Sequence, residues 1–139
     1  MNRTNTYVLD SSVIVAILTQ EPDALSFENF VNMARRLLVG TPTLVEASMV
    51  LISRLGPGEG MTALYKFLAR TDCEIVDFTR VHFAEAATAF EVYGKGRHPA
   101  GLNMGDCNSY ATAKVAGAAL LYKGNDFALT DLPPLTTPA

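Results

Sequence analysis

The sequence predicts an α/β domain in which helices cover both faces of a central, mainly parallel sheet. Short apolar runs that suit buried strands alternate along the chain with segments whose apolar residues recur at the helical period. The length of 139 residues fits one domain, and 49% apolar with 18% charged residues is a globular balance. We find no internal repeat or linker, so we expect one domain over residues 1–139, with 133–139 as a partly flexible tail.

The first half of the chain predicts two strands and three helices. An apolar run directly before Asp10 indicates a buried strand, and the serines after it suit the start of a helix. A proline suits the first turn of a second helix, whose apolar positions recur at the helical period as far as Leu38. The expected elements are a strand over 7–9, a helix over 11–18, a helix from Pro22, a brief strand at 38–39 and a helix from Thr41 to Leu55.

The second half continues the alternation. The Gly-Pro-Gly sequence at 56–58 ends one helix, and the apolar spacing after it predicts another that turns Tyr65 inward. Phe83 and Phe90 lie at helical spacing, which indicates a core stripe or a dimer interface rather than a platform for stacking bases. The expected elements are a helix over 59–70, a strand over 74–78, a helix from Thr79, a loop over 93–103, a helix from Asp106 to Gly117 and a strand over 119–122.

Charge and cysteine content limit the possible functions. The net charge is −3, whereas nucleic-acid binders are usually basic, so RNA binding requires acids gathered around a cation and bases near the substrate. Apolar runs fall short of the ~18 residues of a membrane span, so we expect no membrane association and a cytoplasmic location. Cys73 and Cys107 have no metal-ligand spacing and form no disulfide framework, and we expect both to be small buried residues.

Four acidic residues are expected to meet at one edge of the sheet. Asp10 ends the first strand and Asp126 follows the last one, and ligands of parallel sheets bind beyond the carboxyl ends of the strands. Glu46 and Asp106 lie in the expected first turns of two helices. Clustered carboxylates repel one another unless protons or cations compensate them, and Mg²⁺ prefers oxygen ligands. Such an ion activates water and stabilises charge on a phosphate.

Each acid also has a local explanation, and both remain open. Asp10 and Asp106 can cap helices, and Asp126 lies in a turn where aspartate is common. Thr43 and Glu46 have the spacing of a capping box. Sequence spacing alone does not decide whether the four acids have separate local roles in caps and a turn or form one site.

Five segments together resemble a known family. They are VLDSS at 8–12, TLVE at 43–46, GKGRH at 94–98, LNMGDC at 102–107 and KGNDF at 123–127. In this order and over nearly the whole chain, they resemble the PIN domain, and more closely the VapC toxin ribonucleases of bacterial toxin–antitoxin pairs. The block over 94–107 is the most specific match.

The resemblance implies a fold, an activity and partners. The fold is an α/β/α sandwich around a parallel sheet. Asp10, Glu46, Asp106 and Asp126 match the family's Mg²⁺- or Mn²⁺-binding positions. The implied activity is cleavage of RNA phosphodiester bonds, with a metal-bound water as nucleophile. The implied partners are a VapB-type antitoxin, whose C-terminal segment covers the active site, and a second copy of the chain.

Supporting roles are expected for a few further residues, each beside a simpler alternative. The Ser12 hydroxyl is placed to orient Asp10 or is an ordinary helix cap, and Asn103 supports the site or only shapes a turn. Lys95 and Arg97 bind RNA phosphates or belong to a solvated loop, and for His98 we prefer the solvated loop.

Two other functions compete with the ribonuclease hypothesis. A phosphoryl-accepting signalling domain needs an acceptor aspartate at the end of a central strand, and only Asp77 offers itself. The second is a non-catalytic PIN-like module that binds RNA or protein. The identity of the RNA, cleavage of DNA instead, the number of ions and the identity of the antitoxin stay open at this point.

Overall fold

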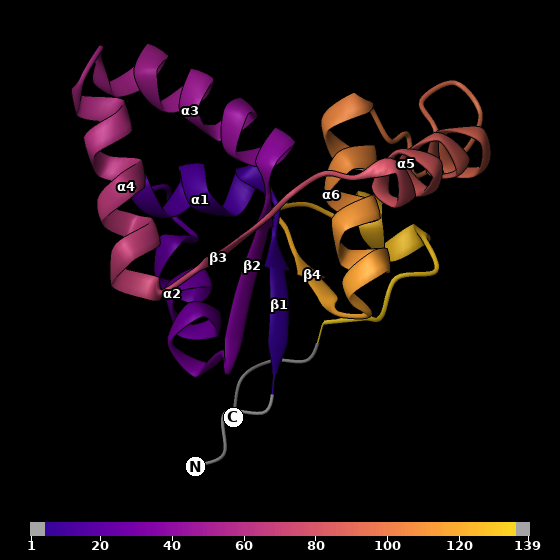
Figure 1. Cartoon of the computed structure of the whole chain (residues 1–139), viewed down its shortest axis with the longest axis horizontal. Coiled ribbons are helices and arrows are strands. Elements are labelled where there is room, and N and C mark those ends of the chain that lie inside the picture. Colours follow the sequence, from indigo (N-terminus) through magenta and orange to yellow (C-terminus); the bar gives the residue numbers. More distant parts are fainter. Residues whose placement is uncertain (1–4, 136–139) are drawn as a thin grey trace.

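A computed structural model describes residues 5–135 of the chain. Figure 1 shows a central sheet with helices packed on both of its faces. The elements are β1 (Thr6–Leu9), α1 (Ser11–Leu18), α2 (Ala24–Met33), β2 (Arg36–Gly40), α3 (Thr41–Leu55), α4 (Glu59–Thr71), β3 (Glu74–Val76), α5 (Arg80–Tyr93), α6 (Met104–Ala116), β4 (Ala119–Leu121) and the 3₁₀ turn η1 (Asp126–Leu129).

The sheet has the strand order β3-β2-β1-β4, and all three strand pairs are parallel. Val8 on β1 is in register with Leu38 on β2 and with Leu120 on β4. Parallel strands need crossover connections, and here helices provide them. The expected α/β fold with a parallel sheet is therefore confirmed. Because all strands run the same way, their carboxyl ends meet at one edge of the sheet, which we call the rim.

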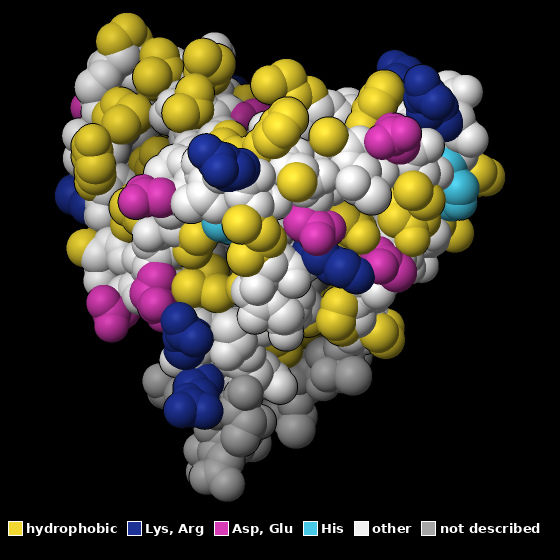
Figure 2. Space-filling model, turned by 45° about the vertical axis from the view of Figure 1, so that its right-hand side comes forward, with side chains coloured by type: hydrophobic (Ala, Val, Ile, Leu, Met, Phe, Trp, Pro, Cys, Tyr) yellow, Lys and Arg dark blue, Asp and Glu magenta, His cyan; other side chains and the backbone are white. Residues whose placement is uncertain are grey.

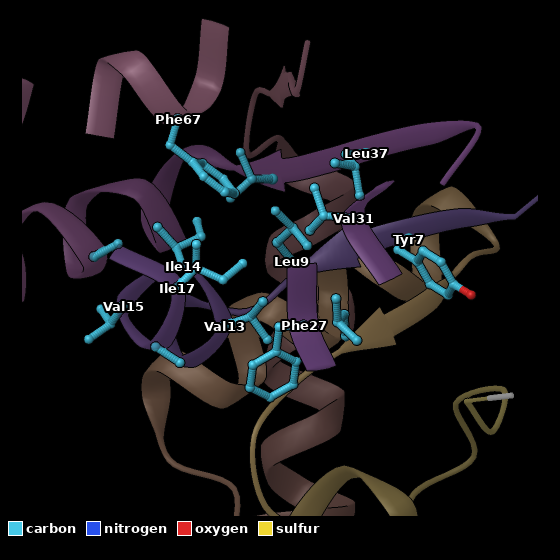
Figure 3. Packing of buried hydrophobic residues seen from close by; sticks show 14 of the residues in the cluster. Tyr7, Leu9, Val13, Ile14, Val15, Ile17, Phe27, Val31, Leu37 and Phe67 are labelled. Carbon is cyan, nitrogen blue, oxygen red and sulfur yellow. The ribbon is translucent and has the colours of Figure 1, made fainter. Parts of the chain in front are cut away.

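Alternating side chains of the strands build two separate cores. Tyr7 and Leu9 pack with helices α1 to α4, whereas Val8 between them packs with α5, α6 and η1. Figure 3 shows the first core, in which Phe67 of α4 and Ile14 of α1 point toward Leu9. Fully burying a side chain of this size stabilises a fold by about 1.5–3 kcal/mol. The rim is thus held between two packed layers.

Three sequence-based expectations about the helices were wrong. α2 ends at Met33, and Leu38 belongs to β2, because pairing with β1 replaces the helical period there. On α4, Tyr65 is 64% exposed and Phe67 is buried in its place. On α5, Phe83 and Phe90 are 65% and 41% exposed, so the core interpretation is wrong and the dimer interface stays a prediction.

The buried side of α5 is formed by residues other than these two phenylalanines. His82 is 5% exposed, and its Nδ1 accepts a hydrogen bond from the backbone N–H of Thr79. His82 and Ala89 are the buried residues of α5, and the two phenylalanines lie on its exposed side.

The expected tail over 133–139 is described only as far as Leu135, and residues 136–139 lie outside the described part of the chain. Between residues 5 and 135, no helix is both long enough and apolar enough to span a membrane.

Candidate active site

Asp10 lies at the centre of the rim. It directly follows the central strand β1, and its side chain caps α1 by accepting a hydrogen bond from the backbone N–H of Ser12 at 3.2 Å. The Ser12 hydroxyl donates to the Asp10 Oδ2 atom at 2.5 Å, and the Ser109 hydroxyl of α6 donates to Oδ1 at 2.6 Å. Asp10 is only 6% exposed. The residue is therefore a cap and also a fixed, buried carboxyl group at the rim.

Glu46 reaches the rim from α3. Since α3 begins at Thr41, Glu46 lies in its second turn rather than its first, and the predicted capping box with Thr43 is absent. The Ser11 hydroxyl donates to the Glu46 Oε1 atom at 2.9 Å. On the other side, a Cβ atom on Gly105 would lie 2.6 Å from Glu46 Oε2. Glu46 is thus held between the first turn of α1 and the first turn of α6.

Asp106 stands in the first turn of α6, which begins at Met104, two residues earlier than expected. Its carboxylate accepts from the Asn103 backbone N–H at 3.0 Å, and the Asn103 side chain accepts from the Asp106 N–H at 2.9 Å. Asn103 is therefore a helix cap, as its simpler interpretation proposed.

The pKa of Asp106 is raised above its ordinary value, chiefly because burial disfavours the charged form. The Asn103 backbone N–H opposes this shift, while the negative charges of Asp10, Asp126 and Glu46 add to it. Asp106 therefore experiences the electrostatic field of the other three acids.

Asp126 is the first residue of η1 and is exposed. Its neighbour Lys123 connects this loop to Asp10, because the Lys123 backbone N–H donates to the Ser12 hydroxyl at 3.1 Å.

Lysine and arginine do not neutralise these acids. Within residues 5–135, none of the four carboxylates has a salt bridge, and the Lys123 ammonium pairs with Glu21 and Asp23 instead. In the same part of the chain, no three Asp, Glu, His or Cys side chains form a group that could hold a metal ion as they are placed. The four acids lie at one rim. Asp10, Glu46 and Asp106 accept hydrogen bonds from hydroxyl groups or backbone N–H groups.

The donor set is chemically compatible with a hard divalent cation, as judged by its atoms and not by their spacing. It consists of oxygen atoms that carry uncompensated negative charge, and such charge favours binding of Mg²⁺ or Mn²⁺. Both thiols stand apart from this set: burial raises the pKa of Cys73 to about 12 and that of Cys107 to about 11, so both stay protonated. Cys107 is buried as expected, whereas Cys73 is half-buried.

A basic loop leads into α6. Lys95 and Arg97 are exposed, and neither forms a salt bridge with residues 5–135. The loop is closed at its base by the Lys95 N–H, which donates to the Leu102 carbonyl at 2.9 Å. His98 is half-buried rather than solvated, because its Nδ1 accepts from the Ala100 N–H and its ring packs edge-on against Tyr93.

An apolar groove of about 640 Å³ lies beside Glu46, between α3 and α6. A second depression of about 440 Å³ lies between α5 and α6, and Met104 lines both. Met104 is 80% exposed. Hydrophobic side chains gather over the upper part of the face in Figure 2, where Figure 1 places α3 and α4.

Sequence reasoning missed the residues that hold the acids. Ser11 had been considered only as a cap, and Ser109 and Gly105 had not been considered at all. The sequence gives no signal for Ser109, because its burial and its contact with Asp10 follow only from the tertiary structure. Asp77, the acceptor that a signalling domain would need, follows the edge strand β3 and not a central strand.

Comparison with known proteins agrees with this arrangement. The family model of the PIN domain matches residues 7–132. The VapC ribonuclease Mb0640 of Mycobacterium bovis is 42% identical over 132 residues, which cover 94% of this chain and 99% of that protein. The Ribonuclease VapC of Mycolicibacterium smegmatis is 44% identical over 125 residues, covering 90% of this chain and 96% of that protein.

Solved structures share the fold at lower sequence identity. The sarcin–ricin loop cleaving toxin VapC20 of Mycobacterium tuberculosis superposes with a TM-score of 0.74 at 14% identity, covering 93% of this chain and 98% of that one. VapBC2 of Rickettsia felis, bound to a DNA fragment from its promoter, gives a TM-score of 0.69 at 21% identity, covering 88% and 91%. The chain therefore belongs to the PIN domain family and, within it, to the VapC ribonucleases.

Proposed function

We propose that this protein is a toxin ribonuclease that hydrolyses RNA phosphodiester bonds at the rim. Asp10, Glu46, Asp106 and Asp126 are the residues that hold a divalent cation, Mg²⁺ or Mn²⁺. When bound, such a cation activates water and stabilises the charge that develops on the phosphate.

One observation carries the proposal: Asp106 has a raised pKa beside three other acids, and no lysine or arginine within residues 5–135 pairs with any of them. Uncompensated charge of one sign is costly in a folded protein and is typical of functional sites. A cation-binding role explains why four separate segments bring carboxyl groups to one edge.

Different residues of the chain orient the acids and bind the RNA at this site. Ser12 and Ser109 fix the orientation of Asp10, and Ser11 fixes that of Glu46. Lys95 and Arg97 bind backbone phosphates of the RNA, because they are exposed on the loop that leads into the helix of Asp106. We propose the cytoplasm as the place of this reaction, because cellular RNA is the proposed substrate.

The test is RNA cleavage by the purified protein with and without Mg²⁺ or Mn²⁺. Asp10→Asn and Asp106→Asn are expected to abolish cleavage. Asp72→Asn is the matched control, because Asp72 is exposed after α4 in a left-handed conformation that asparagine also adopts. Equal cleavage by all four proteins would mean that a contaminant is responsible.

The alternative is a non-catalytic module that binds RNA or protein. It predicts RNA binding without metal-dependent cleavage and no effect of Mg²⁺ or Mn²⁺ on unfolding. The unpaired acids favour the enzyme, because a binding surface for RNA gains nothing from clustered negative charge.

For partners, we propose an antitoxin of the VapB type and a second copy of this chain. The antitoxin covers the rim and supplies the positive charge that the acids lack. The second copy covers the apolar surface made by Met49, Phe83, Phe90 and Met104, because monomers rarely expose large contiguous apolar patches.

The dimer is tested by light scattering after size-exclusion chromatography. Phe83→Glu is expected to give a monomer, whereas Leu25→Glu, at an equally exposed apolar residue of α2, is expected to leave the dimer intact. A monomeric unchanged protein would contradict this part of the proposal.

A further inference from the structure

Three oxygen-bearing side chains from distant segments form a buried chain behind the rim. Ser109 of α6 is 0% exposed, and Thr43 of α3 is 1% exposed. The Ser109 hydroxyl donates to Asp10 Oδ1 at 2.6 Å, and the hydroxyls of Thr43 and Ser109 are 3.3 Å apart. Ser109 and Asp10 are separated by 99 residues in sequence.

The direction of these hydrogen bonds follows from the number of protons. A hydroxyl has one proton to donate, and Ser109 gives its proton to Asp10. Ser109 must therefore accept in its contact with Thr43, so Thr43 is the donor there. The chain runs from Thr43 to Ser109 to Asp10, and each donor polarises the next.

Thr112 on the same helix provides a comparison, because its buried hydroxyl forms a local hydrogen bond within the helix. Thr112 is 1% exposed, and its hydroxyl donates to the Asn108 carbonyl, four residues earlier, at 3.0 Å. This is the common local solution for serine and threonine inside helices. Ser109, one turn earlier, instead donates across the core to the first strand.

We propose that Ser109 is a positioning residue for Asp10 and that Thr43 acts through Ser109. This inference rests on the proposed function, because it gives Asp10 a cation to hold. Ser12 fixes Oδ2 through its backbone N–H and its hydroxyl, and Ser109 fixes Oδ1, which accepts this one hydrogen bond and keeps lone-pair capacity for a ligand. Side chains of three packed helices, Ser12 of α1, Thr43 of α3 and Ser109 of α6, then act together on one carboxylate.

The first test compares Ser109→Ala with the wild type by calorimetric titration with MnCl₂ and by steady-state RNA cleavage. Groups that orient metal ligands typically change affinity or activity by about 10- to 100-fold, so we expect a dissociation constant for Mn²⁺ at least ~10-fold higher. We expect kcat to fall with little change in KM for RNA. Alanine suits a helix interior, so the fold should be kept.

Thr112→Val is the matched control. It removes a buried hydroxyl from the same helix without touching Asp10, and we expect the Mn²⁺ affinity of the wild type. Equal losses of affinity in Ser109→Ala and Thr112→Val would overturn the proposal, because they would reflect disturbance of the helix.

Thr43→Val provides a second, independent variant. Because Thr43 acts through Ser109, we expect a smaller loss of Mn²⁺ affinity and no further loss when it is added to Ser109→Ala. Additive losses would contradict the chain of donors.

The outcomes separate the two proposals. If the wild type binds Mn²⁺ and cleaves RNA and Ser109→Ala does the same equally well, the positioning role is wrong and the proposed function stands. If the wild type neither binds Mn²⁺ nor cleaves RNA, both are wrong.

Discussion

Two sets of carboxylates on this protein differ in whether basic side chains pair with them. Asp131, after η1, accepts from the Tyr110 hydroxyl at 2.5 Å and from the Lys114 ammonium at 2.6 Å. These partners, Lys114 first, hold the pKa of Asp131 below its ordinary value. Glu21 likewise pairs with Lys123 and Arg54, and its pKa is lowered, chiefly by Lys123. Through these ion pairs, Asp131 and Glu21 link different segments of the chain.

At the rim, hydroxyl and backbone donors take the place of basic side chains. Ser12 and Ser109 orient Asp10, and Ser11 orients Glu46, without neutralising either charge. The pKa of Asp106 rises where that of Asp131 falls. The comparison shows that Asp131 and Glu21 pair with basic side chains of the protein, whereas the four acids of the rim have no such partner within residues 5–135.

The largest expected effect is on catalysis. Asp106→Asn should lower the initial rate of Mg²⁺-dependent RNA cleavage at least ~100-fold, because a metal ion contributes several kcal/mol to stabilising the transition state. Asparagine keeps an oxygen that can accept from the Asn103 N–H, so the helix cap survives.

In EDTA, the same variant should be at least as stable toward thermal unfolding as the wild type, because like-charge repulsion is reduced. A variant that loses both activity and stability would indicate a structural rather than a functional acid.

A smaller effect is expected at Gly105. In Gly105→Ala the new Cβ would lie 2.6 Å from the Glu46 carboxylate, which must move away from its place beside Ser11. We expect Mn²⁺ affinity, measured by calorimetry, to fall about 10-fold, as for other disturbances of ligand orientation.

Stability of Gly105→Ala should be kept or raised by up to about 1 kcal/mol, because alanine is the better helix former. Unchanged affinity for Mn²⁺ would show that Glu46 is not a ligand.

The smallest effect is at the compensated acids. Asp131→Asn should cost at most about 1 kcal/mol in chemical denaturation at neutral pH, because the Lys114–Asp131 pair is largely exposed, with 41% and 46% of the two side chains accessible. RNA cleavage should be unchanged.

The pH dependence of this contribution has a definite sign. The folded-state pKa of Asp131 is depressed, so its stabilisation is present above the unfolded value of about 4 and is lost as pH falls through the folded value. The stability difference between wild type and Asp131→Asn should therefore vanish in acid. A difference that persists at pH 2 would contradict the assigned cause.

The fold could be predicted from the sequence because its strands are short apolar runs and its helices carry regular spacing. The face of α5 could not, because Phe83 and Phe90 look like core residues, and the sequence does not distinguish a core stripe from an exposed apolar surface. The buried side of α5 carries the polar residue His82, which the apolar pattern does not indicate.

The position of the four acids near one rim was predictable, but the residues that orient them were not. Asp10 and Asp126 follow strands, and parallel strands bring their ends together. The partner of Asp10 on α6 is 99 residues away, and no local spacing encodes such a contact. The helix from Thr41 to Leu55 was predicted correctly, but Glu46 lies in its second turn and not in its first, so the capping box with Thr43 does not form.

The most direct test of the cation site at the rim is the thermal unfolding temperature as a function of MnCl₂ concentration. We expect it to rise for the wild type and for Asp72→Asn, since a ligand at 100 times its dissociation constant stabilises the native state by about 2.7 kcal/mol. We expect little or no rise for Asp106→Asn. An unfolding temperature that ignores MnCl₂, or that rises equally in Asp106→Asn, would contradict a cation site at the rim.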